Sequence, residues 1–418
     1  IKGTFKSSIN WRLSLSDKDK SACPYVKGRY FKGLKNVESP EWLKKRLLSI
    51  GLKPISSLVD LTNYLTFDIG RPLHVFDAKK VKGNLSIRLS NKNEEILALD
   101  GKKYNFDEKI LIIADEKQPV SIAGIMGGAC TSCDENTTEM FLESAYFDSK
   151  YVAASGRKLN IHSDARYRFE RGVDPVSVDK GIDFMTQLVL DICGGEVSEE
   201  VQAGQINTNK KSIEFDYAKV EKIGGIKIEI SKQESILKNL GFSLERKGNL
   251  CSLSIPSWRH DIHQEVDIVE ELLRVNGYDK LIEEKINIDA YSKKRILNYS
   301  EYSSRIVSSS LVKRGLYEAV TFSFLSKKDA ELFNNISNFI ELDNPISEEL
   351  EVMRPSLLPN LLNMFVKNHN KGLNSKGLFE VGAIYLGDDE TQQISCSSGI
   401  RSGQLLGKHW SSDNREVD

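Results

Sequence analysis

The sequence predicts a multi-domain protein of the α+β class, and three observations lead to that prediction. First, the 418 residues correspond to two to four domains at about 150 residues each. Second, helical and strand-like segments follow one another in blocks along the chain. Third, the composition is 40% hydrophobic and 28% charged, which is typical of globular proteins with apolar cores. No run of about 18 apolar residues is present, so a membrane span is not expected.

Charge and cysteine usage exclude several other classes. The 58 Lys and Arg residues against 59 Asp and Glu residues give a net charge of −1, which excludes a uniformly basic coat but not a local basic patch. The six cysteines are scattered, so a reducing, cytoplasmic setting is expected. Cys130 and Cys133 form a CxxC without a second pair, and an incidental loop pair is preferred to a zinc or redox site. The chain starts at Ile1 without a leader pattern, and we expect it to be a piece of a larger protein.

A first α+β domain is expected over 21–208, after a polar segment, 1–20, that resembles the end of an upstream module. Its first helix begins at Ser39-Pro40 and ends at Gly51, because proline suits a first helical turn and glycine a helix end. The remaining elements follow from apolar periodicity and β-rich composition. They are helices at 56–67, 149–158 and 176–192, and strands at 85–89, 96–99, 110–114 and 140–142.

Two further domains are expected, over 209–283 and 285–418. In the smaller one, a capping box at Ser231 opens a helix, and Pro256 ends a strand. Its last helix spans 266–275. The third domain is expected to contain a helix at 301–313, a β-run at 317–325, a long helix near 349–370 and a strand at 378–386.

An acidic group on the last helix of the smaller domain allows two interpretations. It consists of Asp261, Asp267, Glu270 and Glu271. The last three lie at i, i+3 and i+4 and therefore share one helical face. A solvated face is the first interpretation. Crowded carboxylates could alternatively face a basic partner or a hard cation such as magnesium, which prefers oxygen ligands.

Two other segments have open interpretations. The stretch 163–172 carries Arg166, Arg168 and Arg171, which could contact phosphates or pair with neighbouring carboxylates, and the sequence does not decide between these. The glycine-rich segment 124–128 lacks a nucleotide-binding spacing. It is interpreted first as a tight turn, and second as a turn that presents N–H groups to a ligand.

Ten separate motifs, taken together, resemble one known family. They lie at 57–64, 70–77, 123–128, 141–147, 168–175, 256–259, 269–278, 344–347, 353–358 and 378–382. Their residues and order are similar to those of the β subunit of bacterial phenylalanyl-tRNA synthetase, over about 20–418. The resemblance implies an editing module at 21–208, a helix-turn-helix-like module at 209–283 and a truncated degenerate class II synthetase core at 285–418. The family's N-terminal tRNA-binding and C-terminal anticodon-binding modules would lie outside this chain.

The resemblance implies an editing pocket in the first domain. Its six candidate residues are Asn63, His74, Gly127, Glu143, Ser163 and Ala165. Glu143 matches the glutamate with which the family recognises the hydroxyl of tyrosine, while Asn63 and His74 match pocket-lining residues. Gly127 matches a glycine that leaves room for the substrate, and Ser163 and Ala165 match a wall of small residues. Without the resemblance, Glu143 would be interpreted as a solvated strand residue whose neighbours Leu142 and Ser144 point inward.

Three positions depart from the family pattern. Ser163 stands where some relatives have threonine, which keeps the hydroxyl. Ala129 stands where glutamate is common, and Arg166 where a smaller or polar residue is common. These departures concern the loops around the pocket and the placement of the tRNA end.

Editing makes physical sense for this family because phenylalanine and tyrosine differ by one hydroxyl. An apolar pocket rejects such an isostere only about a hundredfold. A second site with a buried acceptor would favour tyrosine, because phenylalanine would leave the acceptor unpaired at a cost of about 1–3 kcal/mol. The sequence shows no Ser-His-Asp or Cys-His signature, so attack by water on the ester of Tyr-tRNA(Phe) is expected.

The resemblance also implies partners and cofactors. It implies an α2β2 heterotetramer in the cytoplasm, with tRNA(Phe) as substrate and amino-acid activation by ATP in the α subunit. The acidic group matches magnesium-binding positions shared with the α subunit. One alternative is a structural, tRNA-positioning subunit without editing activity. Another is DNA binding by 209–283, which the acidic last helix disfavours because phosphate contacts need Lys and Arg.

Overall fold

The computed structural model describes residues 1–107, 109–206, 211–283, 296–333, 339–373, 377–403 and 410. Helices and several separate sheets are present, which confirms the α+β class. The chain divides into two compact units, Ile1–Glu283 and Glu284–Asp418. In the described ranges, no helix combines the length and the apolar character needed to cross a membrane.

Two sheets with one apolar core between them form the centre of residues 1–206. The first sheet has the order β1-β4-β7-β8-β9, and the second has the order β11-β2-β10-β3, with β12 also paired to β2. The strands are β1 (Trp11–Leu13), β2 (Tyr25–Lys32), β3 (His74–Asp77), β4 (Leu85–Leu89), β7 (Leu111–Ala114), β8 (Pro119–Ile122), β9 (Met126–Gly127), β10 (Glu139–Tyr146), β11 (Glu196–Val197) and β12 (Val201–Gly204), beside the hairpin β5 (Glu95–Leu97) and β6 (Lys103–Asn105). Ile9 and Trp11 are buried in this core, so the segment 1–20 packs with the strands that follow it.

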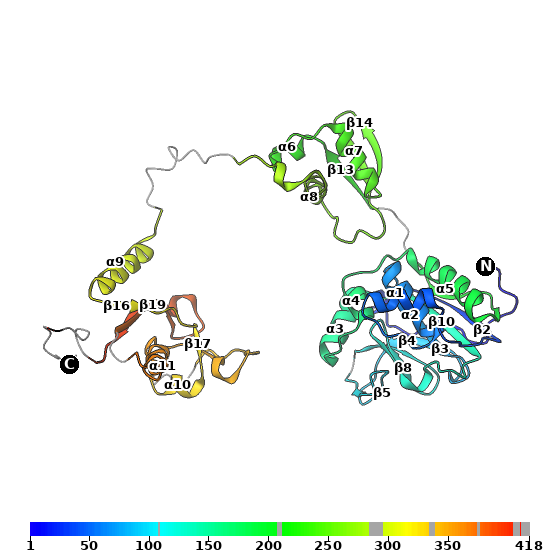
Figure 1. Ribbon diagram of the computed structural model, residues 1–418, viewed down its shortest axis with the longest axis horizontal. Coiled ribbons are helices and arrows are strands. Elements are labelled where there is room, and N and C mark those ends of the chain that lie inside the picture. The colour runs from blue at the N-terminus through cyan, green and yellow to red at the C-terminus, as the bar shows by residue number, and fades with distance from the viewer. Residues whose placement is uncertain are drawn as a thin grey trace. The chain divides into compact units, whose positions relative to one another are not determined.

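Three helices cover the other face of the second sheet and enclose a second apolar core. They are α1 (Glu41–Ser49), α2 (Ser57–Asp68) and α5 (Ser177–Cys193), which Figure 1 shows together on one side of the strands. α1 starts after Pro40, and Gly51 at φ 83° follows its end, as predicted. α3 (Ser149–Leu159) and α4 (Asp164–Phe169) pack against each other beside the first core. The second sheet is therefore buried on both faces.

Residues 211–283 form a small α+β arrangement around a third core. Its strands β13 (Ser212–Asp216), β14 (Ser243–Lys247) and β15 (Leu250–Ser254) pair in the order β13-β15-β14. Its helices are α6 (Lys219–Gly224), α7 (Ile230–Asn239) and α8 (Glu265–Asn276). The predicted capping box at Ser231 is wrong, because α7 already begins at Ile230 and its N-cap, Glu229, makes no side-chain cap. A capping box does form at α8, between Gln264 and Asp267.

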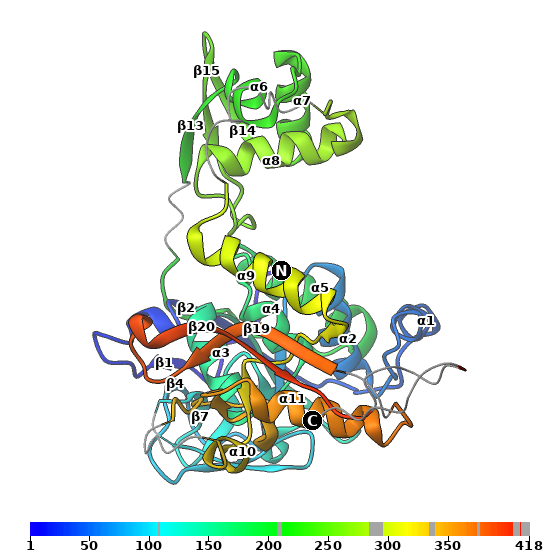
Figure 2. The same ribbon diagram turned by 90° about the vertical axis from the view of Figure 1, so that its left-hand side faces the viewer.

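The second unit contains a three-stranded sheet of order β16-β19-β20, beside α9 and α11 (Figure 2). Its elements are α9 (Tyr299–Lys313), β16 (Leu316–Glu318), β17 (Phe324–Leu325), α10 (Lys327–Glu331), β18 (Val352–Met353), α11 (Leu358–His369), β19 (Gly377–Tyr385) and β20 (Gln393–Ile400). The long helix predicted near 349–370 is wrong in its first half. Pro355 disfavours helix before it, and α11 begins at Leu358 with Pro359 in its first turn. The predicted β-run 317–325 is divided between two sheets.

Candidate active site

Glu143 lies in the middle of β10, with its side chain on the face that meets the first sheet. Its neighbours across the sheet are His74 on β3 and Gly28 on β2. The residue is 6% exposed, and its carboxylate makes no hydrogen bond with any described residue. Burial raises the pKa of Glu143 to about 8, although the positive charge of Arg71 acts in the opposite direction. Glu143 is therefore not an exposed residue of the strand.

Leu142 and Ser144 also point inward, toward the helices. Leu142 is part of the second core, and the Ser144 hydroxyl donates a hydrogen bond to the Val178 carbonyl oxygen at 3.0 Å. Both faces of β10 are covered, so burial of the neighbours does not force Glu143 into solvent. The interpretation of Glu143 as a solvated residue assumes that one face of its sheet is open to water, and this sheet is covered on both faces.

His74 lies beside Glu143 and next to Gly127 of the first sheet. The half-buried imidazole packs edge-on against Phe76, with ring centroids 4.5 Å apart. Its Nε2 atom is buried and has no hydrogen-bond partner among the described residues. Burial lowers the pKa of His74 to about 4, so the ring is neutral at neutral pH. The side chain thus holds a buried ring nitrogen without a partner among the described residues.

Gly127 is held to the size of a hydrogen atom by this imidazole. A Cβ atom at Gly127 would lie 2.3 Å from Cε1 and 2.7 Å from Nε2 of His74. β3 and β9 are the edge strands of the two sheets, so this contact joins the sheets at one edge. The sequence motif 123–128 therefore forms a tight hairpin between β8 and β9. The N–H groups of Ile125 and Gly128 donate to strand carbonyls within it.

The variant Gly127→Ala is expected to displace the His74 ring and to abolish the site's function while the chain stays folded. Overpacking of this kind costs about 1–3 kcal/mol, less than a typical domain stability. Gly399→Ala is the matched control, because the nearest atoms to its new Cβ lie 3.4–3.7 Å away. Thermal unfolding and an activity assay check the prediction. Full activity of Gly127→Ala would show that the contact with His74 has no functional role.

Ser163 is joined to the same hairpin, but its hydroxyl has a structural role. Its Oγ donates to the Ile125 carbonyl oxygen at 2.7 Å and accepts from the Arg166 N–H at 3.1 Å, as the N-cap of α4. Ala165, in the first turn of α4, is partly buried against the first core. The structure therefore brings Ser163 to the hairpin that carries Gly127.

Asn63 lies apart from the other candidates. It is half-buried on α2, which packs on the opposite face of the second sheet from Glu143. No hydrogen bond or ring contact of the described residues joins it to His74 or Glu143. The described contacts thus do not bring Asn63 to the carboxylate.

Arg71 is a residue of the site that sequence reasoning missed. It is completely buried, and its guanidinium donates to the Ala145 carbonyl oxygen at 2.6 Å, the Asp174 carbonyl oxygen at 2.5 Å and the Ser177 hydroxyl at 2.8 Å. It thereby ties β10 to the start of α5. Burial lowers the pKa of Arg71 to about 10, while nearby carboxylates, including Glu143, act to raise it. Its position after Gly70 resembled an ordinary turn residue in the sequence.

Trp11 is a second missed residue. Its side chain is 6% exposed, and its indole N–H has no hydrogen-bond partner among the described residues. A Cβ at Gly28 would lie 2.6 Å from this nitrogen. Gly28 pairs with Glu143 across the sheet, and side chains of such pairs start about 5 Å apart. An unpaired buried donor thus lies in the neighbourhood of the unpaired carboxylate.

Two of the four predicted metal ligands, Asp261 before α8 and Glu271 on α8, form ion pairs with arginine side chains. Asp261 accepts two hydrogen bonds from Arg259, at 2.9 and 2.5 Å. Glu271 accepts from Arg259 at 3.1 Å and from Arg274 at 2.7 Å. The hydrogen bonds from these arginines hold the pKa values of both carboxylates below their usual range. Both carboxylates therefore have their charge compensated within the chain.

The other two predicted ligands do not join them. Asp267 accepts from the N–H groups of His263 and Gln264, at 2.7 and 2.9 Å, and caps α8. Glu270 is exposed. Over the part of the chain that the structure describes, no group of three His, Cys, Asp or Glu side chains converges as a metal site. The arrangement of these four side chains does not fit magnesium.

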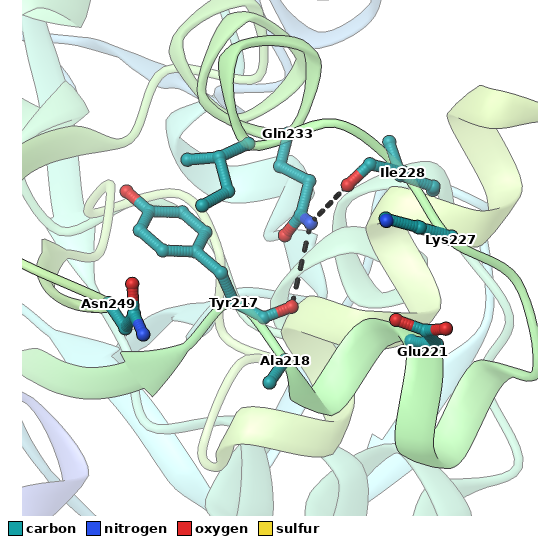
Figure 3. Close-up of a pocket in the computed structure, with 8 residues that line it drawn as sticks. Tyr217, Ala218, Glu221, Lys227, Ile228, Gln233 and Asn249 are labelled. Atoms are coloured by element: carbon teal, nitrogen blue, oxygen red, sulfur yellow. Dashed lines mark hydrogen bonds between the residues drawn. The ribbon is translucent and has the colours of Figure 1, made fainter.

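A separate hollow of about 190 Å³ lies between β13, α6 and α7 (Figure 3). Its walls include Tyr217, Lys227 and Gln233, and the Gln233 amide donates to the Ile228 carbonyl oxygen at 2.7 Å. None of the predicted site residues lines this hollow.

Three family descriptions match successive parts of the chain. The B3/4 domain matches residues 22–194, the tRNA synthetase B5 domain matches 213–278, and the phenylalanyl tRNA synthetase beta chain CLM domain matches 287–418. Glu143 therefore lies within the B3/4 match, and the acidic group on and before α8 lies within the B5 match.

Curated relatives match the chain over its full length. The chain is 45% identical over 418 residues to the phenylalanine–tRNA ligase beta subunit of Paramagnetospirillum magneticum, covering 100% of this chain and 52% of that protein. It is 44% identical over 415 residues to that of Rhodopseudomonas palustris, covering 98% and 51%. The chain thus spans about half the length of these relatives. An N-terminal fragment of the Pyrococcus horikoshii beta subunit aligns with a TM-score of 0.34 and 15% identity, over 66% of this chain and 78% of that fragment, which is too weak to support an argument.

Proposed function

The chain belongs to the family of phenylalanine–tRNA ligase β subunits, and from that premise we propose that its first unit hydrolyses mischarged Tyr-tRNA(Phe). The single observation that carries the proposal is the position of Glu143 beside His74: Glu143 is only 6% exposed, and the buried Nε2 of His74 has no hydrogen-bond partner among the described residues. A buried polar group without a partner is costly, so such groups are retained where a ligand supplies the partner.

The chemistry of the pocket favours tyrosine over phenylalanine. The phenol of a tyrosyl ester would donate its O–H to the carboxyl group of Glu143. Because the raised pKa keeps this group mostly protonated at neutral pH, the hydrogen bond joins two neutral groups and contributes about 0.5–1.5 kcal/mol. Phenylalanine would leave the carboxylate unpaired. Gly127 supports the proposal because the absence of a side chain lets the His74 ring occupy its position beside Glu143.

Hydrolysis itself requires a positioned water. The water attacks the aminoacyl carbonyl carbon, the ester bond to the terminal ribose breaks, and tyrosine and tRNA are released. His74 orients this water or the ester through its unpaired Nε2, as a neutral imidazole. Asn63 and Ser163 do not contact the ester in this scheme. Ser163 caps α4, and Asn63 lies on α2, on the other face of the sheet.

The remaining assignments extend the proposal to the whole protein. We assign a scaffolding role toward the α subunit of an α2β2 ligase, binding of tRNA(Phe), and a location in the cytoplasm. ATP and magnesium serve amino-acid activation, which we assign to the α subunit. Residues 211–283 are assigned as the helix-turn-helix-like module, and the second unit as part of a degenerate class II synthetase core.

The test is release of tyrosine from Tyr-tRNA(Phe), measured beside Phe-tRNA(Phe), by the chain and by its Glu143→Ala variant. In the variant, the preference for the tyrosyl ester is expected to fall by about 2- to 10-fold, the factor equivalent to one hydrogen bond between neutral groups. Glu139→Gln is the matched control, because Glu139 lies on the same strand but bonds Tyr30. Absence of hydrolysis, with and without added α subunit, would instead favour a structural, tRNA-positioning subunit.

A further inference from the structure

Trp11 is a buried tryptophan in the segment 1–20, which precedes the first domain that the sequence predicts. It lies on β1 and is 6% exposed, and its ring is tilted against that of Phe141, with ring centroids 5.5 Å apart. None of the ten sequence motifs includes this residue, and the B3/4 match begins only at residue 22. The resemblance and the family match therefore give this side chain no role.

The indole N–H of Trp11 is buried without a hydrogen-bond partner among the described residues. An indole nitrogen is a donor only, so it needs an acceptor, and buried tryptophans usually find one. A buried donor that lacks an acceptor lowers the stability of the folded state and calls for an explanation. An acceptor atom on a bound molecule would satisfy this nitrogen.

Gly28 allows the indole nitrogen to reach the second sheet. A Cβ atom at Gly28 would lie 2.6 Å from Nε1 of Trp11 and 2.5 Å from Cζ of Phe141. Any larger residue on β2 would therefore displace these two rings. The indole nitrogen thus lies directly over β2 at the position where Gly28 pairs with Glu143.

Three neighbouring strands place polar groups in one row on the face that meets the first sheet. Gly28 of β2 lies opposite Glu143 of β10, which in turn lies opposite His74 of β3. Opposed residues of an antiparallel pair share a face and have Cβ atoms about 5 Å apart. Because the Trp11 nitrogen lies 2.6 Å from the Cβ position of Gly28, it is within about 8 Å of the Glu143 Cβ. The Glu143 side chain covers part of this distance, so one ligand oxygen can bond to both groups.

We propose that Trp11 is a second residue that recognises the tyrosine hydroxyl, because its indole N–H donates to the phenol oxygen while the phenol O–H donates to Glu143. This inference rests on the proposed function, since the ligand is the tyrosyl ester. A phenol is both a donor and an acceptor, and the two contacts use both of these capacities. Phenylalanine has neither capacity and leaves both protein groups unpaired. Trp11 therefore adds to the discrimination that Glu143 provides.

The first test removes the indole N–H without changing the shape of the side chain. Trp11 is replaced by benzothienylalanine, which has sulfur in place of the N–H group. kcat/KM for Tyr-tRNA(Phe) is expected to fall by about 2- to 10-fold, the factor equivalent to one hydrogen bond between neutral groups, while kcat/KM for Phe-tRNA(Phe) stays unchanged. A role in packing alone would change both values equally. The same replacement at Trp42 is the matched control, because Trp42 is 40% exposed and lies on α1.

The second test observes the indole group directly and needs no hydrolysis. The indole N–H signals of the isotope-labelled full chain are followed by NMR during titration with tyrosinamide and, separately, with phenylalaninamide. Trp11→Phe identifies the signal of Trp11. Tyrosinamide is expected to move this signal downfield, because the N–H forms a hydrogen bond, whereas phenylalaninamide is expected to leave it in place. The signals of Trp42 and Trp258 are the internal controls, since both side chains are exposed.

The two tests separate the failure of this inference from the failure of the proposed function. If the tyrosyl ester is hydrolysed selectively and loss of the Trp11 N–H leaves that selectivity unchanged, the inference is wrong and the proposed function stands. Equal shifts of the Trp11 signal with both amides would also contradict the inference, because the proposed contact requires the hydroxyl. If only tyrosinamide moves the signal but no ester is hydrolysed, the proposed function fails and recognition of the phenol by Trp11 stands.

Discussion

The contribution of Glu143 to the free energy of unfolding of the first unit is expected to fall by about 3 kcal/mol as pH rises from about 4.5 to 7, so the difference in stability between the wild type and Glu143→Gln should change by that amount. Burial raises the pKa of Glu143 from 4.5 to about 8. Between these values the folded state binds more protons than the unfolded state, so stability decreases with pH. The decrease starts near the unfolded pKa and ends above the folded one.

His74 contributes in the opposite direction. Burial lowers the pKa of its imidazole from 6.5 to about 4, so the unfolded state binds more protons in that range. Stability from this residue is present above the unfolded pKa and is lost as pH falls toward 4. The wild type and Glu143→Gln share this contribution, so the difference between their pH curves isolates Glu143.

Urea unfolding at a series of pH values measures the effect. Trp11 packs between the two sheets and reports on this unit if the other tryptophans, Trp42, Trp258 and Trp410, are replaced by phenylalanine. Glu139→Gln is the control on the same strand. Parallel pH curves for the wild type and Glu143→Gln would contradict the burial of an unpaired carboxylate.

Replacing Arg71 by methionine is expected to destabilise the first unit by about 3–5 kcal/mol. The variant keeps much of the side-chain volume but leaves the carbonyl oxygens of Ala145 and Asp174 and the Ser177 hydroxyl without their buried donor. It also removes the positive charge that opposes the rise in the pKa of Glu143. The pKa of Glu143 should then rise further.

Arg71→Lys separates the two contributions, because lysine keeps the charge but cannot donate to three acceptors in the planar fork of arginine. It is expected to unfold at lower urea than the wild type while keeping the pH dependence due to Glu143. Arg12→Met, at an exposed arginine of β1, is the control. Equal stability of Arg71→Met and this control would show that the buried network contributes nothing.

Much of the first domain could be predicted from local patterns. The helix over residues 41–49 follows from proline at its start, an apolar stripe and glycine after its end, all within a few residues. The split of the β-run 317–325 depends on pairing with residues far along the chain, such as Phe324 with Met353. No window of local sequence contains that information.

The candidate site shows the same division. Glu143 was identified from a resemblance to a known family. The alternation of polar and apolar residues along 142–144 could not show that Glu143 is buried, because the sheet is covered on both faces. Arg71 was missed because its acceptors come from β10 and the start of α5, about 75 to 105 residues later in the chain. The resemblance places Ser163 in a wall of small residues, whereas the structure shows its hydroxyl as the N-cap of α4.

Because β10 lies between two cores, its side chains point alternately into one core and into the other. Phe141, Glu143 and Ala145 face the core between the two sheets, whereas Met140, Leu142 and Ser144 face the helices. Neighbouring residues can thus vary under separate constraints, one set by the ligand and one by the fold. Substitutions at every second residue of β10 could therefore change the surroundings of Glu143 during evolution while the contacts with α1, α2 and α5 stay intact.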